Sequence, residues 1–293
     1  MFGLSQNTIA KLSKRSGLPI LSKFLPNAAD GVNAAALAGY KRAQGLAFEC
    51  AVETAKTLKV GMTEKDMTDF MDSYLRDNGV VASFHRPLAW FGDRTRFKGF
   101  KSEKHAFPTD RKLENPTDYV VFDLAPILGG FIGDIGFGFT LEPNPVMIEG
   151  RKFLLELREE IARLFATSMT AAEIWKKVDE MVVDRGYENC HKKYQFKVLG
   201  HRVNRVPLDW IPSKAGIYSL HGYWALASRG LFSELLSPWH EGEKKGLWAI
   251  EPHIGLREQG FGSKFEEILV VGDGEAHWLT DDVPHLKMPA GLN

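Results

Sequence analysis

Four acidic side chains interrupt two apolar stretches of the chain, and their residue type and setting indicate metal binding. Asp123 and Asp134 lie in YVVFDLAPILGGFIGDIGFGF, and Glu251 and Glu266 lie in GLWAIEPHIGLREQGFGSKFEEILVV. A carboxylate in an otherwise apolar strand is costly unless a cation or a donor compensates it. A single such residue is more often a solvated edge residue or a turn cap, but two mirrored pairs favour a site that holds cations.

Each acidic pair is expected on a β-hairpin that brings its two members face to face. A turn centred after Leu128 makes Asp123 and Asp134 equidistant from it, and a turn within REQG does the same for Glu251 and Glu266. Opposed residues of antiparallel strands have Cβ atoms about 4.5 to 5.5 Å apart. Such an oxygen-rich site suits Mn²⁺, Fe²⁺, Co²⁺ or Zn²⁺. Hydrolytic sites of this kind usually hold two ions about 3.5 to 4 Å apart, so two divalent metal ions are expected.

Glu267 is the obvious competitor of Glu266 for a place in this site. Side chains alternate between the two faces of a strand, so only one of the two neighbours can share a face with Glu251. The symmetric pairing of the hairpin favours Glu266.

The elements that must hold these hairpins are two similar helical units. Residues 62–79 and 169–186 each begin with a threonine cap that has an acidic partner three residues later, carry apolar residues at helical spacing, and end at glycine. Longer helical stretches, 32–58 and 148–167, precede them, and strand-rich segments follow. The sequence therefore predicts an α+β fold of two pseudo-symmetric helix-helix-strand halves, although two capped helices can also match by chance.

Composition narrows the class of partner and the location. The 37 basic and 37 acidic residues cancel, so no overall field attracts nucleic acid or an anionic membrane, and a peptide or small-molecule substrate is expected. No apolar run is long enough for a membrane span or a signal peptide. The two cysteines, Cys50 and Cys190, support neither a disulfide framework nor a cysteine-rich zinc site. We expect a cytoplasmic protein with an N-terminal extension, residues 1–30, and one catalytic domain, residues 31–293.

Motifs around the acidic residues resemble a known family. VVFDLAP is followed by a second aspartate eleven residues after the first, a GH motif contains His201, an IEP motif contains Glu251, and Glu266 opens the strand EEILVV. In order and spacing these motifs are similar to those of the methionine aminopeptidase, Xaa-Pro dipeptidase and creatinase group, whose architecture is called the pita-bread fold. The resemblance covers roughly residues 33–281. It implies a curved antiparallel sheet and five metal ligands: Asp123, Asp134, His201, Glu251 and Glu266.

The resemblance also implies an activity. It indicates a dinuclear, aminopeptidase-like hydrolase that cleaves an Xaa-Pro bond or an N-terminal amide, in which a hydroxide between the two ions attacks the carbonyl. Glu251 would act as general base as well as ligand. His105, about eighteen residues before Asp123, matches a histidine that contacts the substrate and supports the transition state, although a surface histidine is the plainer interpretation. The resemblance and the aromatic-rich segment 210–235 are also compatible with a homodimer.

The sequence departs from the family pattern at the specificity residues. Leu208 stands where a second histidine is usual, and Gly136 and Phe137 replace the usual Thr or Ser and Arg after the second aspartate. His221 is our candidate for a replacement substrate-binding residue. Because an apolar side chain cannot hydrogen-bond a peptide carbonyl, ordinary peptides are expected to be poor substrates.

Two other functions are compatible with these departures. The fold also hosts non-peptidases, so a lyase or small-amide hydrolase that acts on a small acid or amine is the first alternative. A non-catalytic binding module is the second, but relatives of that kind have lost metal ligands, and all five are present here.

Overall fold

The centre of the molecule is a large antiparallel sheet. The computed structural model describes residues 33–99, 103–206 and 231–287. The strands of the sheet follow one another in the order β2 (Leu88–Phe91), β3 (Val120–Leu124), β6 (Ile135–Phe139), β12 (Phe261–Val271), β10 (Gly246–Ile250), β8 (Gly200–Arg202) and β9 (Leu235–Leu236). Three further strands extend it: β7 (Glu188–Asn189), β11 (His253–Leu256) and β13 (Ala276–Trp278). A smaller sheet pairs β1 (Ala82–Ser83), β4 (Pro126–Leu128) and β5 (Phe131–Ile132).

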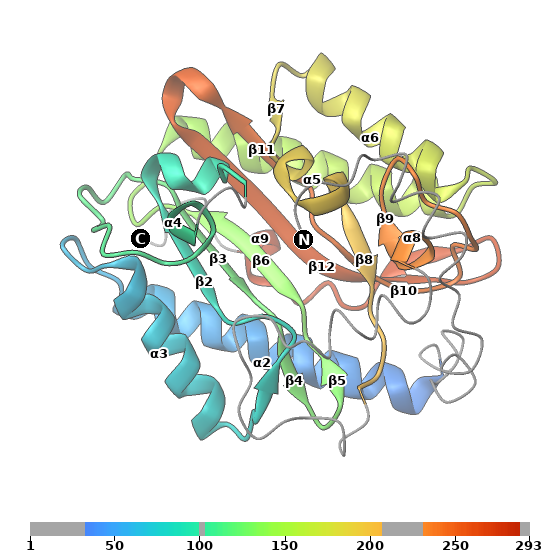
Figure 1. Ribbon diagram of the computed structural model, residues 1–293, viewed down its shortest axis with the longest axis horizontal. Coiled ribbons are helices and arrows are strands. Elements are labelled where there is room, and N and C mark those ends of the chain that lie inside the picture. Colours follow the sequence, from blue (N-terminus) through green and yellow to red (C-terminus); the bar gives the residue numbers. More distant parts are fainter. Residues whose placement is uncertain (1–32, 100–102, 207–230, 288–293) are drawn as a thin grey trace.

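Four long helices cover the large sheet in two pairs (Figure 1). They are α2 (Ala34–Thr57), α3 (Glu64–Asp77), α5 (Pro145–Phe165) and α6 (Ala171–Asp184). The capping boxes predicted at Thr63 and Thr170 are both formed, each with reciprocal hydrogen bonds to the acidic residue three positions later. The shorter helices are α4 (Glu103–Ala106), α8 (Leu231–Glu234), α9 (Pro284–Lys287), η3 (Gly92–Arg96), η4 (Cys190–Lys193), η5 (Gln195–Lys197) and η7 (Arg257–Gln259).

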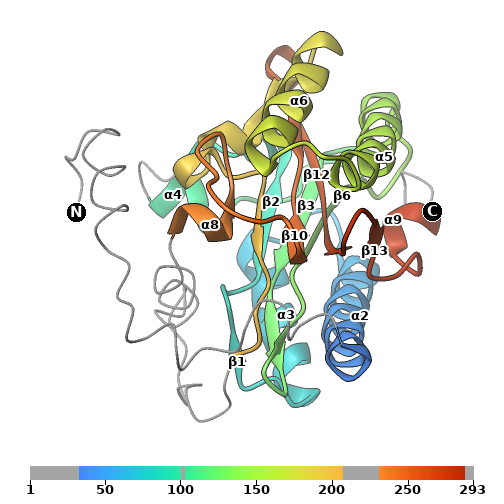
Figure 2. The same ribbon diagram turned by 90° about the vertical axis from the view of Figure 1, so that its right-hand side faces the viewer.

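The two helical pairs build two halves of the core. Buried side chains of α2 and α3 pack with β2, β3 and β6, whereas those of α5 and α6 pack with β10, β11 and β12. Figure 2 shows α2, α5 and α9 on the same side of the sheet. Each half is thus two helices followed by strands, so the predicted α+β fold with two similar halves is confirmed.

The two acidic hairpins differ in how well their register was predicted. In the second, Ile250 pairs with Glu267 and His253 with Lys264, so Glu251 lies opposite Glu266 as expected. In the first, Asp123 pairs with Gly136 rather than with Asp134. That expectation was wrong because the turn lies at Gly129 and Gly130, both with positive φ, one residue later than assumed.

Asp123 and Asp134 nevertheless point to the same face of the sheet. Asp134 is two residues from the partner of Asp123, a diagonal neighbour on the same face. It lies in the two-residue gap between β5 and β6, where the hairpin passes from the small sheet into the large one. The shifted register therefore keeps both carboxylates available to one site.

Glu267 points to the helix-covered face, away from Glu266. Its carboxylate accepts hydrogen bonds from Arg158 of α5 at 2.7 and 2.9 Å, and lies 2.6 Å from His285 Nε2 of α9. Glu267 is fully buried, and the Arg158 guanidinium also stacks on the Trp278 ring. This buried ion pair ties both helices to the central strand β12.

Replacing Arg158 by alanine is expected to destabilise the protein by about 3 to 5 kcal/mol, because it leaves the Glu267 carboxylate buried without its main counter-charge. Urea unfolding measures the loss. Arg163→Ala is the matched control, since Arg163 lies on the same helix and pairs with Glu160 at the surface. Equal losses for the two variants would contradict the importance of the buried pair.

Some predicted features lie outside the described residues. These are the N-terminal extension, residues 1–30, together with Leu208 and His221. Within the described ranges, no helix combines the length and the apolar character that crossing a membrane requires.

Candidate metal centre

The acidic residues meet in one row across the sheet. Asp123 of β3 is paired with Gly136 of β6, and Gly136 is in turn paired with Glu266 of β12. Glu251 continues the row beyond Glu266, and His201 of β8 shares its face because it pairs with Ala249. The structure thus brings together all five residues that the resemblance implies as ligands.

A lysine that the sequence argument overlooked lies among three of these carboxylates. Lys264 Nζ donates to Asp123 Oδ2 at 2.8 Å, to Glu266 Oε2 at 2.8 Å and to Glu251 Oε2 at 3.0 Å. The side chain is only 1% exposed. Lys264 precedes Glu266 by two residues in the same strand, so strand alternation alone places both on one face.

Gly136 provides the space that the lysine occupies. A Cβ atom at this position would lie 3.0 Å from Lys264 Cε and 3.3 Å from Glu266 Oε2. Gly136, which replaces the usual Thr or Ser of the family pattern, therefore leaves room for the buried Lys264 side chain.

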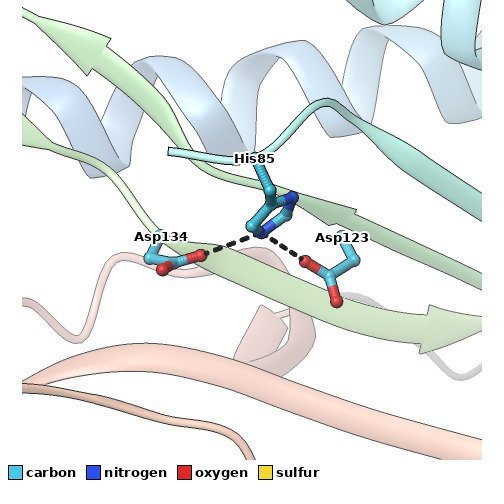
Figure 3. A group of neighbouring side chains, drawn as sticks. All are labelled: His85, Asp123 and Asp134. Atoms are coloured by element: carbon cyan, nitrogen blue, oxygen red, sulfur yellow. Dashed lines mark ion pairs between the residues drawn. The ribbon is translucent and has the colours of Figure 1, made fainter. Parts of the chain in front are cut away.

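A second overlooked residue, His85, faces the two aspartates (Figure 3). Its Nε2 lies 3.2 Å from Asp123 Oδ1 and 3.5 Å from Asp134 Oδ1. His85 belongs to the short segment between β1 and β2, and the hydrogen bond from Phe84 N to Ala125 O holds that segment against the first acidic hairpin. Its one sequence signal is a lone histidine, two residues before Pro87, in a short stretch rich in apolar residues.

The buried charges alter one another's protonation. Burial raises the pKa of Asp123, but Lys264 and His85 oppose it and lower the pKa to about 2. For His201 burial acts in the other direction and would lower the pKa, but the adjacent Asp134 carboxylate raises the pKa of His201 above its ordinary value. Burial raises the pKa of Glu251 and places that of Glu266 well above its usual range. Burial would also raise the pKa of Asp134, but His201 and His85 lower it below its ordinary value. The carboxylates therefore divide into Asp123 and Asp134, which ionise readily, and Glu251 and Glu266, which hold a proton more readily.

The donor set fits divalent cations. Two groups of residues each offer ligand atoms that lie within 4.8 Å of one another inside the group. One group is His85, Asp123 and Asp134, and the other is Asp134, His201 and Glu266. Asp123 Oδ1 and both Asp134 oxygens are buried without a hydrogen bond in the described structure, and imidazole nitrogens lie 3.1 to 3.5 Å away. Carboxylate oxygens with imidazole nitrogens suit Mn²⁺, Fe²⁺, Co²⁺ or Zn²⁺.

His105 lies apart from this cluster in its contacts. It is half-buried in α4, and among the described residues it forms no ion pair or hydrogen bond with the five predicted ligands. Its Nδ1 is buried and has no hydrogen-bond partner in the described structure. A role for His105 toward the substrate therefore stays a prediction.

Replacing Lys264 by methionine should destabilise the metal-free protein by about 3 to 5 kcal/mol, because three carboxylates lose their shared counter-charge. Urea unfolding with and without Mn²⁺ tests this, and added Mn²⁺ should reduce the loss by binding the folded state. Lys244→Met is the control, since Lys244 donates to the Phe165 and Thr167 carbonyls instead. An unchanged stability of the Lys264 variant would contradict the buried charge pairing.

Comparison with known proteins identifies the family and the fold of the chain. A family model described as metallopeptidase family M24 matches residues 38–273. A protein of Staphylococcus aureus (strain bovine RF122 / ET3-1), described as an uncharacterized peptidase, is 25% identical over 151 residues. That match covers 50% of this chain and 40% of the relative, so the chain matches less than half of that relative's length.

Solved structures show the same fold. The X-Pro aminopeptidase from Thermotoga maritima has a TM-score of 0.66 at 17% identity, covering 94% of this chain and 70% of that one. The prolidase from Pyrococcus furiosus has a TM-score of 0.61 at 18% identity, covering 96% and 74%. The resemblance stated from the sequence is thereby confirmed. Because the family match spans most of its length, the chain belongs to metallopeptidase family M24.

Proposed function

We propose that this protein is a metal-dependent hydrolase that cleaves an amide bond at or next to a free N-terminus, as an aminopeptidase or an Xaa-Pro peptidase does. The observation that carries the proposal is the convergence of five side chains on one face of the sheet: the buried Asp123, Asp134, His201 and Glu266, and the half-buried Glu251. Their order and spacing match the family motifs. The proposal extends to two ions, because the ligand atoms form two groups that share Asp134.

Each group of residues has a distinct part in this proposal. Asp134, His201 and Glu266 would hold one ion, which would supply Lewis-acid chemistry by polarising the amide carbonyl and lowering the pKa of water. Glu251 accepts a proton from the attacking water and returns it to the leaving amine, a task that suits a carboxylate whose pKa burial has raised. His105 is proposed to contact the substrate.

Lys264 keeps Glu251 in place for this task. Its ammonium group donates a hydrogen bond to Glu251 Oε2 at 3.0 Å. The same ammonium group binds Asp123 and Glu266, so one buried cation fixes three of the four acidic side chains. Fixed orientation of this kind reduces the reorganisation needed during reaction.

A substrate screen tests the proposed function. The purified protein is stripped with EDTA, reloaded with Mn²⁺ or Co²⁺, and incubated with dipeptides, Xaa-Pro peptides and small amides. We expect hydrolysis that EDTA abolishes and that Mn²⁺ or Co²⁺ restores, with ordinary dipeptides poor substrates because Leu208 stands in place of the usual histidine.

The controls separate this function from the alternatives. Metal binding without any hydrolysis, combined with conversion of a small acid or amine, would favour the non-peptidase reading. Absence of bound metal under all loading conditions would contradict the proposal and favour a binding module.

A further inference from the structure

His85 lies beside the two aspartates of the candidate centre but belongs to neither acidic hairpin. We propose that His85 is a second imidazole ligand of this centre beside His201, and that it would hold an ion together with Asp123 and Asp134. This inference rests on the proposed function, because it assumes that the acidic cluster binds metal.

The two imidazoles are set up in the same way. His201 directs Nε2 toward Asp134 Oδ2 at 3.1 Å, and His85 directs Nε2 toward Asp134 Oδ1 at 3.5 Å. The two imidazoles thus face different oxygens of the Asp134 carboxylate. The Asp134 carboxylate therefore lies between the two imidazole nitrogens, and it belongs to both groups of residues that could hold an ion.

The second nitrogen of each ring is held by a backbone carbonyl. Nδ1 of His201 lies 3.1 Å from the Arg202 carbonyl oxygen, and Nδ1 of His85 lies 2.9 Å from the Arg86 carbonyl oxygen. A carbonyl can only accept, so Nδ1 carries the hydrogen and Nε2 presents its lone pair when the ring is neutral. Metal-bound histidines in proteins are oriented by the same kind of hydrogen bond.

Phe84 packs against both imidazoles. Its ring stacks on His201 with centroids 5.0 Å apart and meets the His85 ring edge-on at 6.2 Å. Phe84 is 8% exposed, and its backbone N–H donates to Ala125 O at 2.8 Å. The loop that carries His85 is therefore tied to the hairpin that carries the two aspartates.

Charge also favours a second ion near His85. Lys264 binds three of the four carboxylates, and it contacts Asp123 through Oδ2, which leaves Oδ1 facing His85. Asp123 Oδ1 and Asp134 Oδ1 are buried without a hydrogen bond in the described structure, and both face His85. An ion held here would compensate carboxylate oxygens that Lys264 does not contact.

The other role open to His85 is that of a positively charged partner for the two aspartates. The two roles predict opposite effects of removing it. A ligand that is lost weakens metal binding, whereas a competing cation that is lost strengthens it. The direction of the change in metal affinity therefore distinguishes the two roles.

Isothermal titration of the EDTA-stripped protein with Mn²⁺, together with ion counting after gel filtration, is the test. We expect two ions per wild-type chain. His85→Ala should weaken one of them at least about tenfold, since even loss of a group that only orients a ligand costs 10 to 100-fold. His201→Ala should weaken the other ion.

His240→Ala is the matched control. His240 is buried and has the same type of Nδ1 contact, 2.9 Å from the Leu235 carbonyl oxygen, but it belongs to neither group of ligand atoms. Its affinity for Mn²⁺ should equal that of the wild type. X-ray absorption of the Co²⁺-loaded wild type gives a second readout, because it counts the imidazoles bound per ion and does not depend on a variant that folds.

The outcomes separate the two proposals. If the wild type binds ions but His85→Ala binds them equally or more tightly, the ligand role of His85 is overturned and the proposed function stands. A cobalt spectrum with a single imidazole per two ions would overturn it as well. If the wild type binds no ion, the proposed function itself fails.

Discussion

Replacing Asp134 by asparagine is expected to abolish metal binding and to lower the rate of hydrolysis by about 10³-fold or more. Asp134 is fully buried and is the residue shared by both groups of ligand atoms. An amide offers one neutral oxygen in place of two charged ones, so neither ion keeps its full coordination. A bound ion supplies several kcal/mol of transition-state stabilisation, and each 1.4 kcal/mol corresponds to a factor of ten.

The fold should survive this change. Asp134 lies in the gap between β5 and β6, and the apolar residues Ile132 and Ile135, which hold this part of the hairpin in the core, are buried on either side of it. Circular dichroism and ion counting therefore measure two separate properties. Asp273→Asn is the control, because Asp273 is exposed and pairs with Lys245 at the surface. Loss of folded structure in Asp134→Asn together with normal metal content in the residual fraction would sink the assignment.

Replacing Glu251 by glutamine should lower kcat by about 10² to 10⁴-fold, the usual contribution of a general base, while leaving most of the bound metal in place. Glu251 is bound by Lys264 and lies outside both groups of ligand atoms. Glutamine keeps the size and one hydrogen-bonding oxygen but cannot accept the proton. The change is therefore expected in kcat rather than in ion content.

Steady-state kinetics and ion counting on the same preparation test this split. Glu258→Gln is the matched control, because Glu258 lies exposed at the tip of the same hairpin and should leave kcat unchanged. Glu251→Gln that loses metal as completely as Asp134→Asn would show that Glu251 acts mainly as a ligand. Unchanged kcat would remove its role as a base.

Local rules were enough for the elements and for part of the site. The capping boxes at Thr63 and Thr170 depend on residues three positions apart, so sequence reasoning predicted both helices. The position of Glu251 opposite Glu266 also followed from sequence, because the hairpin is centred within the REQG turn, between Glu258 and Gln259, as expected. The opposite faces of Glu266 and Glu267 followed from sequence as well, because neighbouring side chains of a strand point to opposite faces.

The first hairpin shows where this reasoning stops. Its turn at Gly129 and Gly130 lies one residue later than expected, and two glycines with positive φ leave several turn positions open in the sequence. Lys264 was readable in principle, since it shares a face with Glu266, but its meaning depends on the missing Cβ of Gly136 in the neighbouring strand.

The sequence by itself determined the two-part α+β architecture and the five acidic and histidine residues that meet on the sheet. Only the tertiary structure decided that His85 and Lys264 join them. Their contacts join segments of the chain that are far apart, and Lys264 and Asp123 are 141 positions apart in the chain. Periodicity and capping act over a few residues, whereas these contacts depend on how separate strands lie side by side.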